Sequence, residues 1–453
     1  MGEENNLRID LVSFPKKSFW KLSMPIMCFV LFNAVYGIID LFWVSKLDAS
    51  SFYAVSVSIP FFTLICSMGD SIGQGTNSLL SRSIGANDYN NAYKAIFHGA
   101  VFCIAIWILI VACTPFLDDI LIFSKIDKCI DLTLRYLLPT CLFSIFFIMP
   151  NFFSESLQAE GDSKRPTIII ICGNILNLIL DPILIFYLNM GVEGAAYATI
   201  VSSFITVVVF IYLYASKKTQ IPLPFRYTKL NKHIFFEIAN VAFPNFLIDS
   251  LFCSIAIFIN GVLLRDLGQI GVLLYSTSIK LQDILLTPII GYGRGLMSVA
   301  GQLFGSKKLD DLKMIYVYAL KVSIATVAVI AVLFIIFRNP IYSAFSINGM
   351  RLGITYIAVF GSLILLCRVF LTICSKMLDA FGKSYYNLAY TIIYAVLQIV
   401  FISVLDLIIP YGSSVLFGIL LAQIIISISY VIFLEYTFRK FKKQKEEDTL
   451  VVI

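Results

Sequence analysis

The chain has 453 residues, of which 59% are hydrophobic and only 14% are charged, and its net charge is +6. Soluble domains are typically about 45–50% apolar and about 25% charged, so this composition excludes an ordinary soluble protein and indicates a membrane protein. The basic excess does not indicate nucleic-acid binding, because no basic patch is interleaved with aromatic side chains on a soluble domain.

Long apolar stretches recur along the whole chain and predict an all-α integral membrane protein. Since about 20 apolar residues cross a bilayer core as a helix, we expect about twelve spans. The polar N-terminus leads directly into the first span without a cleavage site, so we expect no removed signal peptide. The predicted spans are 19–45, 51–79, 91–116, 130–156, 166–188, 192–216, 235–264, 270–303, 311–337, 352–381, 385–409 and 412–438.

The distribution of lysine and arginine predicts the orientation of these spans. With both termini inside, about 24 of the 34 basic residues fall in cytoplasmic loops and flanks. The densest clusters are Lys16 with Lys17, residues 217–232 and residues 439–445. We therefore expect a multi-pass protein of the inner or plasma membrane with both termini in the cytoplasm.

The first predicted span carries an aspartate, Asp40, inside the apolar sequence FNAVYGIIDLFWV. A charge at the centre of a spanning helix costs about 2.5–3.5 kcal/mol on insertion scales, so it needs a partner or a task, commonly the handling of a cation or a proton. Tyr36 lies four residues earlier on the same helix face, and Asn33 continues that stripe.

The end of the second span recurs in the second half of the chain. GQGTNSLLSRSIG at Gly73–Gly85 and GRGLMSVAGQLFG at Gly293–Gly305 share three glycines and a serine at an offset of 220 residues. Two further matches have offsets of 219 and 221: Pro25 with Pro244, and LQAEG at 157–161 with LDAFG at 378–382.

An offset of 220 residues contains six predicted spans, an even number, so the two halves have the same orientation. This predicts two six-helix bundles related by a pseudo-two-fold axis along the membrane normal, as in transporters built from parallel repeats. The expected division is an N-lobe at 1–216, a cytoplasmic linker at 217–233, a C-lobe at 234–438 and a cytoplasmic tail at 439–453.

The fifth span carries a second aspartate, Asp181, in GNILNLILDPILIF, and the sixth carries Thr199. Asn177 shares the face of Asp181, and Pro182 should loosen the helix there. By helix rise, Asp40, Asp181 and Thr199 all lie within roughly 7–11 Å of the outer membrane face, so they can meet.

Carboxylate, amide, hydroxyl and phenol oxygens together suit a hard cation such as Na⁺, and crowded carboxylates also suit a shared proton. The sequence does not choose between Na⁺ and H⁺. The alternative is structural: Asp181 and Asn177 would only bridge neighbouring helices by hydrogen bonds, and Tyr36 and Thr199 would only pack. The predicted Na⁺ ligands are Asp40, Asp181, Asn177 and Thr199, with Tyr36 beside them.

Twelve spans in two halves, the intramembrane Asp40, and the segments LQAEGDSKRP, NILNLILDP and GVEGAAYAT resemble the multidrug and toxic compound extrusion (MATE) family over essentially the whole chain. The resemblance implies a secondary antiporter that exports organic, often cationic, compounds in exchange for Na⁺ or H⁺. It is similar to the prokaryotic branch whose cation site lies in the N-terminal bundle. That site would use Asp40 and Asp181, with Tyr36, Asn177 and Thr199 in support, and Pro25 would be the position at which the first helix bends.

The chain departs from another branch of this family, which uses acids in the seventh and tenth spans. The seventh span has Asp249, but the tenth carries Arg368 at a similar depth. We therefore expect an Asp249–Arg368 ion pair in the C-lobe rather than a second cation site. Asp70, deeper toward the cytoplasmic side in the second span, either lines a lower cavity or takes part in proton passage, or is solvated near the inner vestibule.

Two other function classes remain as alternatives. A lipid or lipid-linked oligosaccharide flippase of the same superfamily would carry a cationic groove for phosphates, whereas the intramembrane bases here are few. A membrane transferase would need an acidic metal motif or a histidine at a membrane face, and only two histidines occur. Gly382-Lys383-Ser384 lacks the first glycine of a phosphate loop, since position 377 is Met377. We expect a monomer in the lipid bilayer with a small organic substrate, without enzymatic activity, cofactor, nucleotide or nucleic acid.

Overall fold

The computed structural model describes residues 11–123, 129–221, 229–340, 351–408 and 413–451. Throughout these ranges the regular structure is helical, without strands. The first half forms α1 (Pro15–Ser45), α2 (Ala49–Gly85), α3 (Tyr89–Cys113), η2 (Thr114–Phe116), α4 (Leu117–Phe123), α5 (Ile130–Leu142), α6 (Ile145–Ala159), α7 (Lys164–Pro182), η3 (Ile183–Tyr187) and α8 (Gly191–Ala215). The second half forms α9 (Lys232–Leu285), α10 (Thr287–Gly305), α11 (Leu309–Ile336), α13 (Arg351–Ala380), α14 (Ser384–Asp406) and α15 (Ser413–Val451).

Ten helices in the described ranges are long and apolar enough to cross a membrane, and twelve spans result when two bent pairs are each counted as one. The pairs are α5 with α6, bent by 48°, and Thr277–Leu285 with α10, bent by 45°. Pro288, next to the second bend, has no N–H to continue the helix, which explains the break there. The predicted twelve-span, all-α fold is confirmed.

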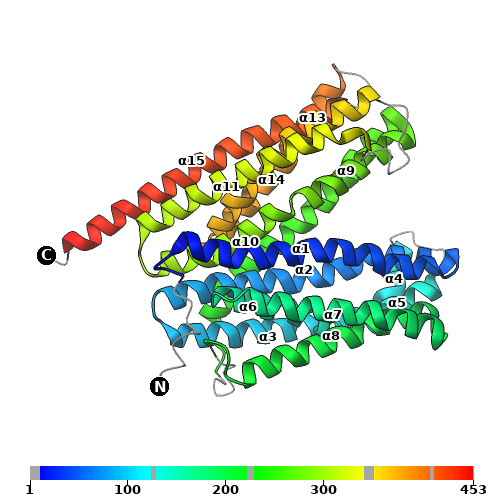
Figure 1. Cartoon of the computed structure of the whole chain (residues 1–453), viewed down its shortest axis with the longest axis horizontal. Helices are drawn as coiled ribbons and strands as arrows, with labels where there is room; N and C mark the ends of the chain where they lie inside the picture. Colours follow the sequence, from blue (N-terminus) through cyan, green and yellow to red (C-terminus); the bar gives the residue numbers. More distant parts are fainter. Residues whose placement is uncertain (1–10, 124–128, 222–228, 341–350, 409–412, 452–453) are drawn as a thin grey trace.

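The two bundles form a V. Figure 1 shows that they lie together near the two chain termini and separate toward the opposite end. At the closed end, α1 and α2 of the first half pack against α9 and α10 of the second half. The repeated glycines permit this approach, since a Cβ added at Gly85 would meet the backbone of Gln302, and one at Gly305 would meet the carbonyl of Arg82.

The helices that begin each half cross into the core of the other half. Phe19 and Leu22 of α1 belong to a hydrophobic cluster built mainly from α10, α11, α13 and α15. In the same way, Ile238 and Ala242 of α9 pack into the core of the first half. Among the described residues, these two clusters place the apolar contacts between the bundles toward the closed end of the V.

The repeat also has a local structural basis in a pair of tight turns. Gly161 follows α6 with φ 92°, and Gly382 follows α13 with φ 70°. A side chain would be strained in this left-handed region, so both copies of the turn need glycine. The division into lobes at residues 217–233 stays a prediction, and residues 222–228 of this linker lie outside the described residues.

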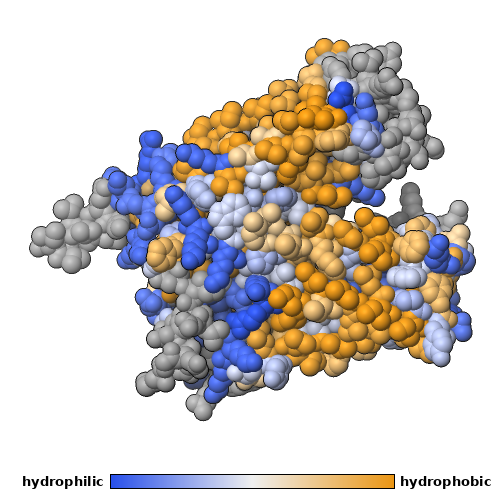
Figure 2. Space-filling view, viewed as in Figure 1, coloured by the Kyte–Doolittle hydropathy of each residue, from blue (hydrophilic) through white to orange (hydrophobic). Residues whose placement is uncertain are grey.

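The outer surface of the bundles is strongly apolar. Figure 2 shows hydrophobic residues over the length of both bundles and hydrophilic residues gathered near their ends. Large apolar side chains such as Ile108, Leu109 and Val329 are more than half exposed, which suits contact with lipid chains rather than with water.

Candidate functional site

The predicted site residues of the first half form one polar cluster, which we call the N-lobe cluster (Tyr36, Asp40, Asn177, Asp181 and Thr199). The Tyr36 hydroxyl lies 2.8 Å from the Asn177 amide, which also lies 3.4 Å from both Asp181 Oδ1 and Thr199 Oγ1. Asn177 joins the same three residues in either orientation of its amide. Contacts among α1, α7 and α8 thus bring together residues more than 140 positions apart in the sequence.

The two carboxyl groups of this cluster meet. Asp40 and Asp181 are within hydrogen-bonding distance of each other, and Asp181 is only 1% exposed. Two carboxylates repel at this separation, so the pair is stable only when it shares a proton or holds a cation between its oxygens. Two acids and three neutral oxygen-bearing side chains provide the donor set that either role requires.

The backbone beside Asp181 departs from an ordinary α-helix, as Pro182 predicts. α7 ends at Pro182 and continues as the π-helical turn η3, in which the N–H of Leu188 donates to the carbonyl of Ile183. π-Helical turns are often found at functional sites because they reorient neighbouring side chains. Next to the cluster, the Tyr136 phenol of α5 also lies within electrostatic range of both aspartates, a neighbour that the sequence did not indicate.

The predicted bend position, Pro25, lies inside α1, which continues through it as one helix. Because proline has no N–H, the carbonyl of Lys21 lacks its usual partner in the next turn. The hydroxyl of Ser163, just before α7, donates to this carbonyl at 3.2 Å. Lys21 therefore ties α1 to the turn between α6 and α7, four residues before the predicted bend at Pro25. This contact would have to change if the helix bends there.

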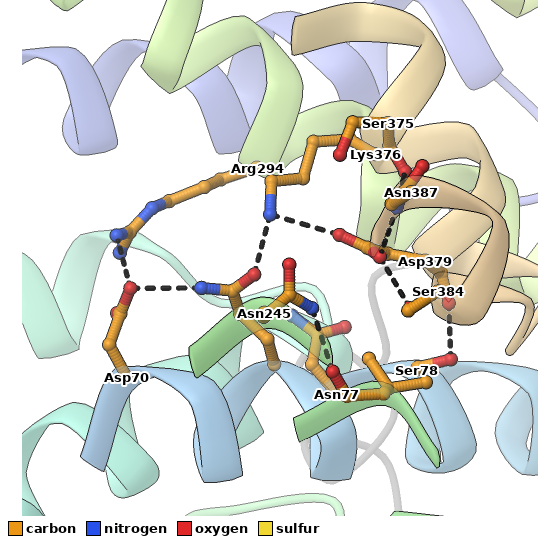
Figure 3. A network of polar contacts seen from close by, with 12 residues as sticks. Asp70, Asn77, Ser78, Asn245, Arg294, Ser375, Lys376, Asp379, Ser384 and Asn387 are labelled. Carbon is orange, nitrogen blue, oxygen red and sulfur yellow. Dashed lines mark hydrogen bonds and ion pairs between the residues drawn. The ribbon is translucent and has the colours of Figure 1, made fainter. Parts of the chain in front are cut away.

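A second polar cluster joins the two bundles where they meet, and we call it the inter-bundle network (Figure 3). Its members are Asp70, Gln74, Asn77, Glu155, Arg294, Ser298, Lys376 and Asp379. Arg294 of α10 donates to Asp70 of α2 at 2.9 Å and to Glu155 of α6 at 3.1 Å. Asn77 of α2 donates both to Glu155 at 2.9 Å and to Ser298 of α10 at 3.2 Å. Asp70 therefore lines a cavity of about 290 Å³, which is one of the placements expected for it, and its carboxylate pairs there with Arg294 of the other half.

The network contains a second contact between the bundles, Lys376 with Gln74, at the positions that the repeat makes equivalent to Glu155 and Arg294. Lys376 of α13 donates to Gln74 of α2 at 2.5 Å and to Asp379 at 3.0 Å. At the repeat offsets, Gln74 corresponds to Arg294, and Lys376 corresponds to Glu155. Sequence reasoning missed Glu155 and Lys376; opposite charges at equivalent positions of the two halves were the signal that could have revealed them.

The expected Asp249–Arg368 ion pair is wrong. Arg368 donates instead to Asp283 at 3.3 Å, while Asp249 is held by Ser67 and lies in the field of Asp70, Lys376 and Arg294. Both residues line the same cavity, but Arg368 pairs with Asp283. Similar depth along the membrane normal therefore brought the two residues to one cavity without making them partners.

Outside the spans, Glu160 follows α6 and is 3% exposed. Its Oε2 accepts from the backbone N–H of Gln220 at 2.8 Å, and its Oε1 is buried without a hydrogen-bond partner in the described structure. Burial raises the pKa of Glu160 to about 8, although the backbone hydrogen bonds oppose this shift. The folded protein is therefore most stable when Glu160 is protonated, because the cost of burying its charge outweighs the stronger hydrogen bonds of the charged form.

This pKa gives a stability prediction. Because the pKa of Glu160 is higher in the folded than in the unfolded protein, its contribution to stability is complete below about pH 4.5 and is lost as the pH rises to about 8. Each pH unit in that window removes up to about 1.4 kcal/mol. Glu160→Gln should flatten the fall in thermal unfolding temperature between pH 5 and 8, measured in detergent.

The matched control is Glu447→Gln, on an exposed side chain of α15, which should keep the wild-type pH profile. An unchanged profile in Glu160→Gln as well would mean that this carboxyl is charged throughout the range.

Comparisons with known proteins agree with this architecture. The model of the MatE family matches residues 25–183 and 241–404, more than two thirds of the chain. The multidrug export protein MepA of Staphylococcus aureus (strain NCTC 8325 / PS 47) is 27% identical over 295 residues, which are 64% of this chain and 65% of MepA. The chain thus matches just under two thirds of that curated relative's length.

Solved structures match nearly the whole chain. A crystal structure of MATE in the bent conformation has a TM-score of 0.91 at 25% identity, with 97% of this chain and 98% of that one covered. The outward-facing conformation of a multidrug resistance MATE family transporter of the MOP superfamily has a TM-score of 0.88 at 26% identity, with 96% and 98% covered. The family match, the twelve-span fold and the repeat together identify the chain as a multi-pass membrane transporter of the MatE family.

Proposed function

We propose that this protein is a secondary antiporter that exports organic, often cationic, compounds in exchange for Na⁺ or H⁺ by alternating access. The observation that carries the proposal is the contact between the Asp40 and Asp181 carboxyl groups inside the N-lobe cluster. The name of the staphylococcal relative, a multidrug export protein, supports the same direction of transport and the same class of cargo.

The proposed cycle uses the V shape. With both termini in the cytoplasm of an inner or plasma membrane, the closed end of the V faces inward and the open end faces outward. A cation entering from outside neutralises Asp40 and Asp181, and α1 then bends at Pro25, which reshapes the N-lobe cavity and releases the substrate. The emptied protein rocks to the inward-facing state, for which the inter-bundle network has to separate.

The charges between the bundles favour this function over a lipid flippase. Arg294, Lys376 and Arg368 are each paired with an aspartate, so these cations are engaged by the protein rather than offered to a phosphate group. We propose that the transporter acts as a monomer, without a cofactor other than the coupling ion.

Dye efflux from vesicles containing the purified protein tests the proposal. A sodium gradient and a proton gradient are imposed separately, each with the membrane potential clamped. We expect one of the two gradients, directed inward, to drive efflux well above the rate in protein-free vesicles. Efflux that responds to neither gradient, or lipid scrambling without dye efflux, would overturn antiport in favour of a different transport mode.

A further inference from the structure

The last helix of the chain is longer than a bilayer span and carries a run of basic residues near its end. α15 has 39 residues, which at 1.5 Å per residue is about 58 Å, whereas the hydrocarbon core of a bilayer is about 30 Å thick. Figure 1 shows α15 running past the other helices toward the C-terminus. Its segment RKFKK, at 439–443, therefore leaves the hydrocarbon core at the closed end of the V and reaches the lipid headgroups.

This basic segment is docked on the second half of the protein by aromatic side chains. The Phe441 ring packs against Phe304 and Phe381, with ring centroids 5.0 Å and 5.3 Å apart. Phe438, one turn earlier, packs against Phe381 at 6.0 Å. Moving the segment away would expose these rings to water, so its basic residues keep a fixed place beside the turn between α13 and α14.

Two lysines meet at this turn without an acidic partner. Lys383 lies over the Phe441 ring, with its Nζ 4.7 Å from the ring centroid, and its charge is within electrostatic range of Lys440. Neither lysine belongs to an ion pair in the described ranges, and Glu435 of the same helix is already held by Lys313 at 2.7 Å. Burial and the charge of Lys440 lower the pKa of Lys383 below its ordinary value. An anion placed here would offset this repulsion.

The equivalent turn of the first half has an anion of its own. At the offset of 221 residues, Lys383 corresponds to Asp162 in the turn between α6 and α7. Asp162 Oδ1 accepts from the backbone N–H of Arg165 at 3.2 Å, and its other carboxylate oxygen accepts from the Arg165 side chain. The second half has Tyr386 in place of Arg165 and a cation in place of the carboxylate. At the equivalent place it therefore leaves room for an anion from outside the chain.

The surface of α15 below Lys440 follows the order of groups in a phospholipid. Ile432, Tyr436 and Lys440 are spaced four residues apart, so they share one helix face, and the first two are 64% and 62% exposed. Along this face an aliphatic, an aromatic and a cationic side chain follow one another from the membrane interior toward water. Acyl chain, interface and headgroup have the same order, and tyrosine is typical of the interface. The order favours a lipid over a free phosphate, which has no apolar part.

We propose that Lys383 and Lys440 bind the phosphate group of an anionic phospholipid, whose acyl chains lie along Ile432 and Tyr436. A zwitterionic lipid carries its own cation, which the two lysines repel, so the site prefers phosphatidylglycerol to phosphatidylcholine. None of these four residues lines the 290 Å³ cavity of the inter-bundle network. The lipid is therefore a bound component of the protein rather than its cargo, and the inference does not depend on the proposed export function.

Lipid titration into the delipidated full-length protein tests the binding. The protein is held in a non-ionic detergent, and bound lipids are counted by native mass spectrometry. Dioleoyl phosphatidylglycerol and dioleoyl phosphatidylcholine have the same acyl chains and differ only in the headgroup. We expect the first phosphatidylglycerol to bind about ten-fold or more tighter than the first phosphatidylcholine. Inorganic phosphate in large excess should not displace it.

Variants then locate the site. Lys383→Gln/Lys440→Gln should bind phosphatidylglycerol about ten-fold more weakly and lose the preference over phosphatidylcholine, whereas Lys383→Arg/Lys440→Arg should stay within about two-fold of the wild type. The matched control is Lys229→Gln/Lys232→Gln, which removes the same charge from exposed residues at the start of α9 and should bind as the wild type does. Without lipid, the double glutamine variant should unfold at no lower temperature than the wild type, because it loses a repulsion.

Equal affinities for the two lipids, or wild-type binding by Lys383→Gln/Lys440→Gln, would overturn the proposal. An equal loss in Lys229→Gln/Lys232→Gln would overturn it as well, since binding would then follow the overall positive charge and no particular site. Displacement of the lipid by inorganic phosphate would make this a site for free phosphate and would exclude the lipid as its ligand.

Discussion

Asp40→Asn and Asp181→Asn are each expected to abolish ion-driven efflux while the protein remains folded. An asparagine keeps the shape of the side chain but cannot take up a proton and is a weaker ligand for Na⁺ than a carboxylate. Because the two carboxyl groups lie within hydrogen-bonding distance of each other, removing one charge relieves repulsion and leaves no buried ion pair broken. Folding should therefore be nearly unaffected, and the unfolding temperature should stay close to that of the wild type.

The measurement is dye efflux from vesicles under the gradient that drives the wild type. Asp310→Asn, on the exposed first turn of α11, is the matched control and should transport normally. Wild-type efflux by either variant would show that the aspartate pair does not couple transport, and the proposed cycle would fail with it.

Arg294→Gln is expected to destabilise the closed end of the V strongly. Glu155, whose side chain is 1% exposed, would keep only the Asn77 amide, and Asp70 would keep only Gln74. Removing one partner of a buried ion pair costs about 3–5 kcal/mol, because the other charge stays buried without compensation. Glu155→Gln should be less costly, and the double variant Glu155→Gln/Arg294→Gln should recover part of the loss.

Two measurements are needed, because the pair joins the halves as well as stabilising the fold. Thermal unfolding of the wild type, the single variants and the double variant gives a coupling energy, which we expect to be about 2 kcal/mol or more. Spin labels at Ala86 and Lys308, exposed residues on the turns after α2 and α10, report the distance between the bundles. The distance should broaden toward longer values in Arg294→Gln. Additive stability losses with an unchanged distance would mean that the network does not hold the halves together.

The class, the spans and the repeat could be predicted from the sequence, since each depends on local properties. Hydropathy over about 20 residues decides whether a helix crosses the bilayer, and an even number of spans per repeat fixes the relation of the halves. The meeting of Asp40, Tyr36, Asn177, Asp181 and Thr199 also followed from helix geometry. Residues at i and i+4 share a face, and distance from the membrane surface restricts which spans can bring polar groups together.

The choice of partners could not be predicted in the same way. Arg368 bonds Asp283 rather than Asp249, and Arg294 bonds Asp70 and Glu155 from the other half of the chain. These choices depend on the rotation of each helix about its axis and on how the bundles cross at the repeated glycines. Both result from the packing of many side chains at once, and one sequence does not reveal them.

The sequence by itself therefore determined a twelve-span protein with two like-oriented halves and an acidic, cation-suited set in the first half. Only the tertiary structure decided that the halves meet at one end through an exchanged pair of polar contacts. The physical reason is that spans follow from the local transfer of apolar residues into lipid, whereas ion pairs between bundles need the relative positions of distant helices.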